Sequence, residues 1–247
     1  SLDKVESLEQ FYITAKAFGR FAYDLNDFDA SQLVEVIPQF HDTRNRYRQL
    51  EEAIREDRVG RVKEVQEEIA FIQNRKADCF LLYDLLDEGV LPLRVTHNDT
   101  KLNNIMFDSE TKEPLCIVDL DTVMPGLVLF DFGDSIRFGA NDCAEDEPDL
   151  TKVNFDFDLY ETYVKGFIEG TNGILTEAEL EYLPWGARVI TLEQGIRFLT
   201  DYINGDVYYA TTRPGQNLDR ARTQLKLVQD MENVWDKMVE AVQNAQK

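Results

Sequence analysis

The stretch Val95-Thr96-His97-Asn98-Asp99-Thr100-Lys101-Leu102-Asn103-Asn104-Ile105 contains the pattern His-x-Asp-x-x-x-x-Asn. A second stretch, Cys116-Ile117-Val118-Asp119-Leu120-Asp121, places two carboxylates directly after an apolar run. The composition around these stretches is typical of short strands over 93–96, 105–107 and 115–118. The loop after the first strand and the end of the last strand can then lie close together. The sequence therefore predicts a compact polar site within a small central β element.

The residue types at this site suit phosphoryl transfer. A carboxylate can orient an attacking hydroxyl and accept its proton, and an amide with a second carboxylate can hold Mg²⁺ against the transferring phosphate. The protein supplies positioning and electrostatics, with little covalent chemistry of its own. A site built from so few side chains is therefore chemically sufficient for this reaction.

Helical periodicity precedes the β element. Apolar residues at helical spacing predict helices over 8–25 and 44–75, the second broken near Gly60, and over 83–86, ending before Gly89. The first half of the chain is therefore expected to be mostly helical.

Helical periodicity also follows the β element. One stripe predicts a helix with Asp156 as its N-cap and Gly170 as its stop: Leu159, Tyr160, Tyr163, Val164, Phe167 and Ile168. Thr176 and Glu179 form a capping box that starts another helix, and apolar residues from 221 to 242 predict a single last helix. The expected class is α/β (α+β), rich in helix, with no linker that would divide it into two domains.

Charge and cysteine content restrict the class of partner and the compartment. The chain of 247 residues has 26 Lys and Arg against 47 Asp and Glu, a net charge of −21. Such an acidic chain repels phosphate backbones and anionic lipid, so nucleic-acid and membrane partners are not expected. Two histidines exclude a His-rich zinc site. The odd number of cysteines indicates free thiols and hence a cytoplasmic location: Cys79, Cys116 and Cys143.

The two polar stretches together resemble the catalytic and metal motifs of the aminoglycoside/choline phosphotransferase family, which has a protein-kinase-like fold. His97-x-Asp99-x-x-x-x-Asn104 and Asp119 at a strand end carry this resemblance, and they are specific in combination. The chain resembles most closely the N-acetylhexosamine 1-kinases of the same superfamily, through the stretches 96–104, 117–127 and 130–139. The similarity extends through most of the chain.

The resemblance implies roles for the residues of the predicted site. Asp99 would be the catalytic base, and Asn104 and Asp119 would be the magnesium ligands. Asp121 would contact a second ion or the substrate. ATP would be the co-substrate, and a sugar the acceptor.

Further residues would support the site or bind the sugar. His97 would brace the loop, and Asp131 in Phe130-Asp131-Phe132-Gly133 would anchor it. This literal Asp-Phe-Gly is not expected to be the metal triplet of protein kinases, because Asp119-Leu120-Asp121 follows the apolar strand. An Arg and a Tyr that contact the sugar in the hexosamine kinases correspond by spacing to Arg197 and Tyr208.

One part of the kinase pattern is missing from this sequence. No Gly-x-Gly-x-x-Gly occurs, and no Lys lies in an apolar strand ahead of Asp99. These features belong to the N-terminal lobe of a kinase, where they hold the ATP phosphates. Residues 1–247 are therefore expected to be the helix-rich C-terminal lobe of a longer kinase, with weak ATP binding and little turnover on their own.

The function expected on this basis is ATP- and Mg-dependent phosphorylation of the anomeric hydroxyl of an N-acetylhexosamine. A kinase for choline, an aminoglycoside or another sugar remains an alternative, since an acidic pocket also suits cationic acceptors. A non-catalytic module that binds sugar or metal is a second alternative for the isolated lobe.

Several residues allow a structural interpretation beside the functional one. Asp121 is as consistent with a structural group as with a ligand, and the motif residues themselves could be turn and cap residues. Arg197 and Asp201, four residues apart, could form a plain surface ion pair. Tyr208 and Tyr209 could stack on a sugar ring or belong to the core.

Overall fold

The computed structural model of the chain describes residues 5, 7–141 and 143–247. The helices are α1 (Leu8–Asp24), α2 (Thr43–Glu56), α3 (Gln66–Gln73), α4 (Lys76–Asp87), α5 (Val128–Gly139), α6 (Phe157–Thr171), α7 (Glu177–Asn204), α8 (Gln216–Asn233) and α9 (Trp235–Ala245). The strands are β1 (Arg94–Thr96), β2 (Ile105–Phe107), β3 (Pro114–Ile117) and β4 (Met124–Gly126). The described residues thus form a helix-rich structure with very short strands, as the sequence predicted.

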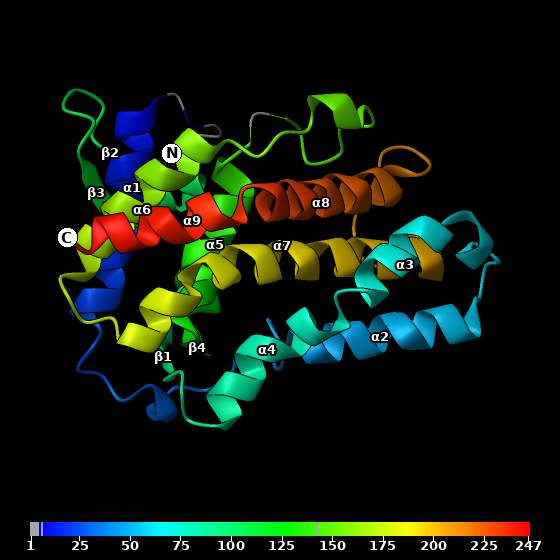
Figure 1. Cartoon of the computed structure of the whole chain (residues 1–247), viewed down its shortest axis with the longest axis horizontal. Helices are drawn as coiled ribbons and strands as arrows, with labels where there is room; N and C mark the ends of the chain where they lie inside the picture. The colour runs from blue at the N-terminus through cyan, green and yellow to red at the C-terminus, as the bar shows by residue number, and fades with distance from the viewer. Residues whose placement is uncertain (1–4, 6, 142) are drawn as a thin grey trace.

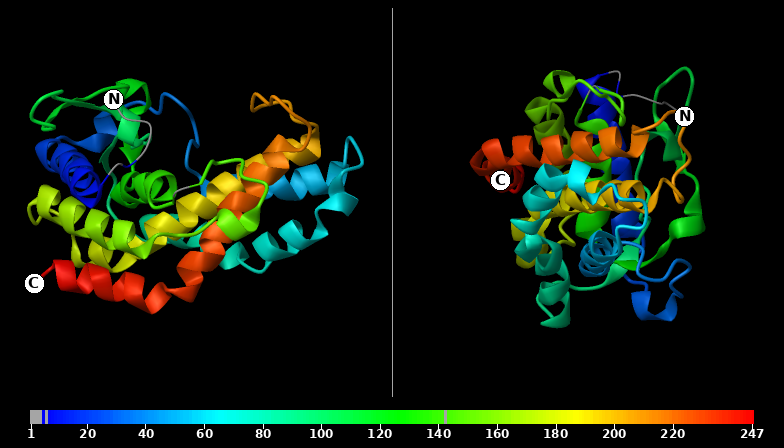
Figure 2. Two further views of the ribbon diagram at one scale, coloured as in Figure 1. Left: turned by 90° about the horizontal axis from the view of Figure 1, so that it is seen from above. Right: turned by 90° about the vertical axis from the view of Figure 1, so that its right-hand side faces the viewer.

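Helix α7 runs through the middle of the molecule, with α8 along one side and α2 along the other (Figure 1). Helices α1 and α6 pack against each other at the opposite end from the loop after α2. Seen from above, α8 and α9 follow one another with a bend between them (Figure 2). The long α7 helix therefore connects the part of the molecule that holds the strands with the part that holds α2 and α3.

The strands form two separate sheets, whereas the sequence predicted one β element. Strand β1 pairs antiparallel with β4, and β2 pairs antiparallel with β3. Strand β4 was not predicted because Pro125 and Gly126 are unfavourable in a strand interior. Gly126 lies opposite Arg94, and a Cβ at Gly126 would collide with the Thr96 side chain. The strand residues that looked unsuitable are thus the ones that allow this close pairing.

Several predicted helix ends are confirmed and others are wrong. Asp156 caps α6, and Thr176 with Glu179 forms the capping box of α7. However, α6 continues through Gly170 and ends at Thr171, and the C-cap Asn172 has a left-handed backbone with a φ of 48°. Gly170 is needed inside the helix, because a Cβ there would collide with the backbone of Lys16 in α1.

The predicted single last helix is two helices. The apolar stripe from 221 to 242 is interrupted at Val234, which ends α8 and precedes α9. Met231 and Met238 both remain fully buried, so the stripe indicated the buried face correctly but not the bend. Helix α5 was not predicted at all. Almost all of it is buried, including its polar residues Asp131, Asp134 and Ser135, so these residues do not mark a solvent-facing side.

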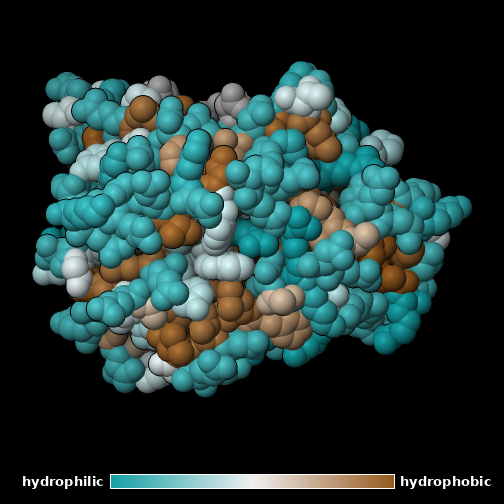
Figure 3. All heavy atoms as spheres, viewed as in Figure 1, coloured by the Kyte–Doolittle hydropathy of each residue, from teal (hydrophilic) through white to brown (hydrophobic). Residues whose placement is uncertain are grey.

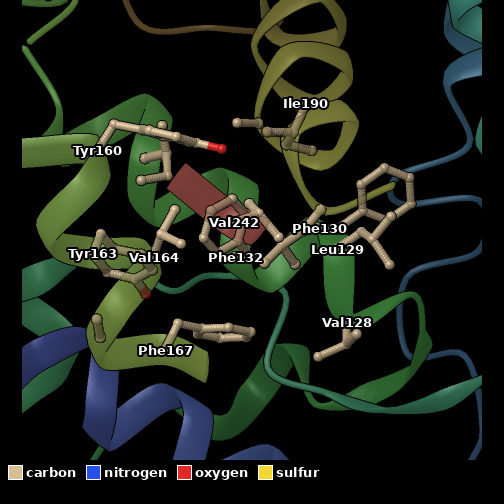
Figure 4. Packing of buried hydrophobic residues seen from close by; sticks show 14 of the residues in the cluster. Val128, Leu129, Phe130, Phe132, Tyr160, Tyr163, Val164, Phe167, Ile190 and Val242 are labelled. Carbon is tan, nitrogen blue, oxygen red and sulfur yellow. The ribbon is translucent and has the colours of Figure 1, made fainter. Parts of the chain in front are cut away.

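The larger hydrophobic core lies where α5, α6 and the first half of α7 meet. Phe132 of α5 makes edge contacts with Tyr160, Tyr163 and Phe167 of α6, with ring centroids 5.4–6.1 Å apart (Figure 4). A second core lies among α2, α3, α8 and the second half of α7. Both cores are closed around α7, so this helix is held rigidly along its length.

The surface agrees with the composition. The face seen in Figure 3 is mostly hydrophilic, with separate hydrophobic groups between the charged residues. Cys79 and Cys116 are free thiols. Within the described part of the chain, the helices are too short or too polar to cross a membrane.

Candidate active site

A buried carboxylate on α5 holds the catalytic loop, which we define as residues 96–104. The backbone N–H groups of His97 and Asn98 donate to the two carboxylate oxygens of Asp131, at 2.8 and 2.7 Å. The Thr100 hydroxyl donates to the Asp131 carbonyl at 2.6 Å, and the Ser135 hydroxyl donates to the Thr100 carbonyl at 2.6 Å. Burial raises the pKa of Asp131, while the two N–H donors act in the opposite direction. The loop backbone is therefore fixed from the helix beneath it.

The Asp-Phe-Gly sequence has a structural explanation within α5. Asp131 anchors the catalytic loop, and Phe132 points into the core. Gly133 faces Gly186 of α7, where a Cβ on either residue would collide with the backbone of the other helix. Each of the three residues thus has a packing or anchoring contact, and all three are buried.

His97 connects the catalytic loop to the end of β3. Its Nε2 lies 3.1 Å from the Val118 carbonyl, and its Nδ1 accepts the Asp99 N–H at 3.3 Å. An imidazole that accepts at Nδ1 and donates at Nε2 is neutral with its proton on Nε2. The ring is fully buried against Phe18 and Phe21. These contacts brace the loop directly before Asp99.

Asp99 is partly exposed and has two neighbours from its own loop. The Asn104 side-chain N–H₂ donates to the Asp99 carbonyl at 2.8 Å and to its carboxylate at 3.1 Å. The Lys101 ammonium lies 3.0 Å from the other carboxylate oxygen, and the Asp99 side chain remains 24% exposed. Because the Asn104 nitrogen points at Asp99, its amide oxygen points away from Asp99 and is suited to a cation.

Asp119 follows the strand that pairs with the residues after Asn104. The Val118 N–H donates to the Asn104 carbonyl at 2.9 Å, which ties the two backbones together. Asp119 has a left-handed backbone with a φ of 63°, which Asp tolerates better than most residues. Asp119 and Asp121 are exposed, and within the described ranges neither carboxylate has a hydrogen-bond or ion-pair partner.

The donor set suits magnesium but is small. Asn104, Asp119 and Asp121 offer oxygen ligands only, which Mg²⁺ prefers. Among residues 5, 7–141 and 143–247, no cluster of three or more His, Cys, Asp or Glu side chains is arranged to hold a metal by itself. The residues therefore fit an ion that takes one or two protein ligands and completes its shell with phosphate oxygens and water.

A cavity of about 450 Å³ opens beside Asp99. Arg197 of α7 lines the same cavity, so the structure brings these two predicted site residues together. The Arg197 guanidinium donates to the Gln194 side chain at 3.0 Å and lies near the rings of Phe40 and Tyr209, 5.8 and 5.6 Å from their centroids. A cavity of similar size, about 470 Å³, shares Arg137 and Glu145 with it but contains none of the predicted site residues.

Tyr208 does not line the cavity beside Asp99. Its side chain is 73% exposed, and it borders a smaller pocket of about 170 Å³ on the other side of Arg197. The neighbouring Tyr209 lines the cavity instead, and its hydroxyl accepts from the Gln194 side chain at 3.2 Å. Spacing alone could not distinguish two adjacent tyrosines.

Asp201 anchors the segment that carries both tyrosines, residues 205–210, which we call the tyrosine turn. Asp201 is 4% exposed, and its carboxylate accepts from the backbone N–H groups of Val207, Tyr208 and Tyr209 at 2.9, 2.8 and 3.0 Å. The alternative of a plain surface ion pair between Arg197 and Asp201 is therefore wrong, because Arg197 donates to Gln194 and Asp201 is buried. The Asp201 carboxylate pairs with three backbone N–H groups of the turn that follows α7.

Sequence reasoning missed several residues near the cavity. Lys101 could have been found, since it is the only cation between Asp99 and Asn104. Gln194 became visible only from its position in the cavity, whereas the sequence offered Tyr209 beside Tyr208 as a ring that could stack on a sugar. His41 and Glu193, which form a buried pair behind the loop, are 152 positions apart and share no sequence pattern.

A family model described as the phosphotransferase enzyme family matches residues 6–163. The chain belongs to this family. The match covers more than half of the chain, including the catalytic loop, Asp119, Asp121 and Asp131, and it ends before Arg197 and the tyrosine turn. This phosphotransferase therefore has its predicted catalytic side within the matched region and its predicted acceptor side outside it.

Proposed function

We propose that this phosphotransferase transfers the γ-phosphoryl group of ATP to a sugar hydroxyl, as an N-acetylhexosamine 1-kinase that forms N-acetylhexosamine 1-phosphate. The observation that carries the proposal is the cavity that Asp99 and Arg197 line together. Its volume of about 450 Å³ falls in the usual range for small-molecule sites, about 300–1,000 Å³. A carboxylate at one wall and a planar cation with aromatic rings at the other suit a polar ring with an apolar face.

Asp99 is the base in this proposal. It orients the anomeric hydroxyl toward the γ-phosphorus and accepts its proton as the bond forms. Asn104 fixes the Asp99 carboxylate through the 3.1 Å hydrogen bond. Lys101, 3.0 Å from Asp99, supplies a positive charge for the transferring phosphoryl group.

Asn104 and Asp119 are the proposed magnesium ligands, and Asp121 lies close enough in sequence to contribute. Magnesium would neutralise the ATP phosphates in a chain whose own net charge is −21. The exposed carboxylate of Asp119 supports this role. Among the described residues it has no partner that it would have to give up in order to bind a cation.

The charges of the cavity favour a neutral acceptor over a cationic one. Lys101, Arg137, Arg197 and Arg220 line it together with Asp99, Asp134 and Glu145. This balance offers no net attraction to the amines of choline or an aminoglycoside. Gln194 and Arg197 can hydrogen-bond hydroxyl and carbonyl oxygens, and the rings of Phe40, Phe198 and Tyr209 can pack on a sugar face.

We further propose that the other half of the ATP site comes from an N-terminal lobe outside residues 1–247. The described strands contain no lysine, so they lack the residue that usually pairs with the α- and β-phosphates. The reaction is assigned to the cytoplasm, where ATP is available and an exposed thiol such as Cys116 stays reduced.

The test is phosphorylation of a panel of acceptors by the full-length protein with Mg-ATP. The panel contains N-acetylglucosamine, N-acetylgalactosamine, glucose, choline and an aminoglycoside, and ³¹P NMR identifies the product. The expected product is the anomeric phosphate of an N-acetylhexosamine. Preferred turnover of choline or the aminoglycoside would overturn the acceptor assignment, and turnover unaffected by Asp99→Asn would overturn the mechanism.

A further inference from the structure

A buried histidine connects α7 to the catalytic loop. The His41 Nδ1 lies 3.1 Å from a carboxylate oxygen of Glu193 in α7, and its Nε2 lies 3.2 Å from the backbone carbonyl of Asn98. His41 is 8% exposed and Glu193 is fully buried. The second carboxylate oxygen of Glu193 accepts from the Thr43 hydroxyl at 2.6 Å. The imidazole therefore spans from α7 to the residue before Asp99.

Both partners of the His41 ring are acceptors. A carboxylate and a backbone carbonyl cannot donate, so both ring nitrogens must carry a proton for both hydrogen bonds to form. Burial alone lowers the pKa of His41, but the hydrogen bond and charge of Glu193 outweigh it and the net pKa is raised. For Glu193, burial alone raises the pKa, but the hydrogen bond and positive charge of His41 bring the net pKa below its usual range. The pair is thus an imidazolium and a carboxylate.

We propose that His41 is a positioning residue for Asp99, because it fastens the Asn98 carbonyl to α7 from behind the catalytic loop. The inference rests on the proposed function, in which Asp99 is the base. Asn98 has a left-handed backbone with a φ of 65°, so its peptide needs fixed partners on both sides. Asp131 holds its N–H, and His41 holds its carbonyl.

The same helix carries the acceptor side of the cavity. Gln194 and Arg197 follow Glu193 by one residue and by one helical turn. A rigid link from Glu193 through His41 to Asn98 therefore fixes the distance between the proposed base and the proposed acceptor contacts. Errors of about 1 Å in such a distance can cost about 100-fold in rate.

Other charged groups around the ring favour its protonated form. Asp134 and Asp131 of α5 act on His41 through their negative charge. Tyr83 of α4 is near Glu193, and burial raises its pKa, so it stays neutral. Arg197 is the cation on this side, and it lowers the pKa of Glu193. Apart from His41, Asp131 is the nearby group that titrates close to neutral pH, because burial raises its pKa to about 6. This value lies below the raised pKa of His41, so a loss of activity at higher pH reports on His41.

The first test is the protonation of His41 in the wild-type chain, measured by NMR of its ring nitrogens. The chain has only two histidines, so the spectrum contains two imidazoles. We expect both ring nitrogens of His41 to carry a proton at neutral pH, and His97 to be neutral with its proton on Nε2. The ordinary pKa of histidine is about 6.5. A His41 ring that is neutral below this pH would overturn the proposal.

The second test is steady-state kinetics of His41→Gln and Glu193→Gln in the full-length protein. We expect kcat to fall about 10- to 100-fold in each, with little change in the KM for ATP. Activity of the wild type is also expected to decline as the pH rises through the raised pKa of His41, and this decline should be absent in His41→Gln. Wild-type kcat in a folded His41→Gln protein would overturn the proposal.

Glu179→Gln is the matched control. Glu179 is also a fully buried carboxylate of α7, and it pairs with Arg94 at 2.5 Å, away from the cavity. We expect Glu179→Gln to lower the stability of the protein as Glu193→Gln does. Unlike Glu193→Gln, it should leave kcat unchanged. Equal losses of kcat in the two variants would show a general effect of destabilising α7 and would contradict a positioning role.

If Asp99→Asn keeps its activity, the proposed function fails. An inactive Asp99→Asn with an active His41→Gln refutes only the positioning role.

Discussion

The catalytic loop and the tyrosine turn border the same cavity, and each is anchored by one buried aspartate. Asp131 accepts two backbone N–H groups from the catalytic loop, and Asp201 accepts three from the tyrosine turn. A carboxylate satisfies several converging N–H groups better than any neutral side chain, which explains the same solution at both places. The two segments differ in their exposure to solvent.

The catalytic loop is mostly buried, whereas part of the tyrosine turn is exposed to solvent. Contacts to the loop come from α5, from the end of β3 and from His41. The turn is held by Asp201 and by Asn217, whose side chain bonds Asp201 at 2.9 Å and Asp206 at 3.0 Å. Arg61 also bonds Asp206 at 2.6 Å, and Arg220 bonds the Ala210 carbonyl at 3.1 Å. Val207 and Tyr208 in the turn are 77% and 73% exposed. We infer that the chemistry depends on the buried loop and that acceptor binding depends on the more exposed turn.

The largest effect is expected at Asp99, within the catalytic loop. Asp99→Asn keeps the size of the side chain but removes its basicity, so kcat should fall by about 10²–10⁴, or roughly 3–5 kcal/mol of barrier. Thermal melting should change little, because the partly exposed ion pair with Lys101 contributes about 0–1 kcal/mol. Steady-state kinetics and a melt of the same sample provide the measurement. A folded variant with most of its kcat would remove Asp99 as the base.

A smaller effect is expected at Asp119, beside the loop. Asp119→Asn weakens one proposed metal ligand, so the Mg²⁺ concentration needed for half-maximal activity should rise more than about tenfold, the loss seen when even an outer-shell partner is removed. Ser109→Ala, at an exposed turn residue between β2 and β3, is the control. An unchanged magnesium titration would move the metal role to Asp121.

Matched substitutions of the two anchors test the comparison directly. Asp131→Asn and Asp201→Asn each leave backbone N–H groups poorly paired, and each should cost about 1–3 kcal/mol of unfolding free energy. We expect Asp131→Asn to lower kcat and Asp201→Asn mainly to raise the KM for the acceptor. Thermal melts and kinetics of both variants measure this. If Asp201→Asn lowers kcat with an unchanged acceptor KM, the division between loop and turn is wrong.

The catalytic loop was also the part that the sequence allowed us to predict. Its residues lie within about ten positions of each other, so their spacing reflects their geometry, and Asp131 belongs to a distinctive sequence. The turn depends on contacts between residues that are distant or ambiguous in sequence. Asp201 looked like a surface partner of Arg197, because helical spacing cannot show that the residues after α7 fold back onto it. Helix α5 was missed for a similar reason, since its burial on all sides comes from tertiary packing.

The smallest effect distinguishes the two adjacent tyrosines of the turn. Tyr209 lines the cavity beside Asp99 and accepts a hydrogen bond from Gln194, whereas the Tyr208 side chain is 73% exposed. Tyr209→Phe removes one hydrogen bond, about 1 kcal/mol, and should raise the acceptor KM about fivefold with little change in kcat. Tyr208→Phe is the matched control and should leave both constants unchanged.

The outcome of this last pair decides which tyrosine contacts the acceptor. The resemblance by spacing favours Tyr208, and the cavity favours Tyr209. A larger effect at Tyr208 would mean that the turn rearranges when the acceptor binds, bringing the exposed ring inward. Such a movement is compatible with the Asp201 anchor, because its hydrogen bonds to Tyr208 and Tyr209 go to their backbone N–H groups. The kinetic comparison therefore also tests whether the turn is as adaptable as its exposure indicates.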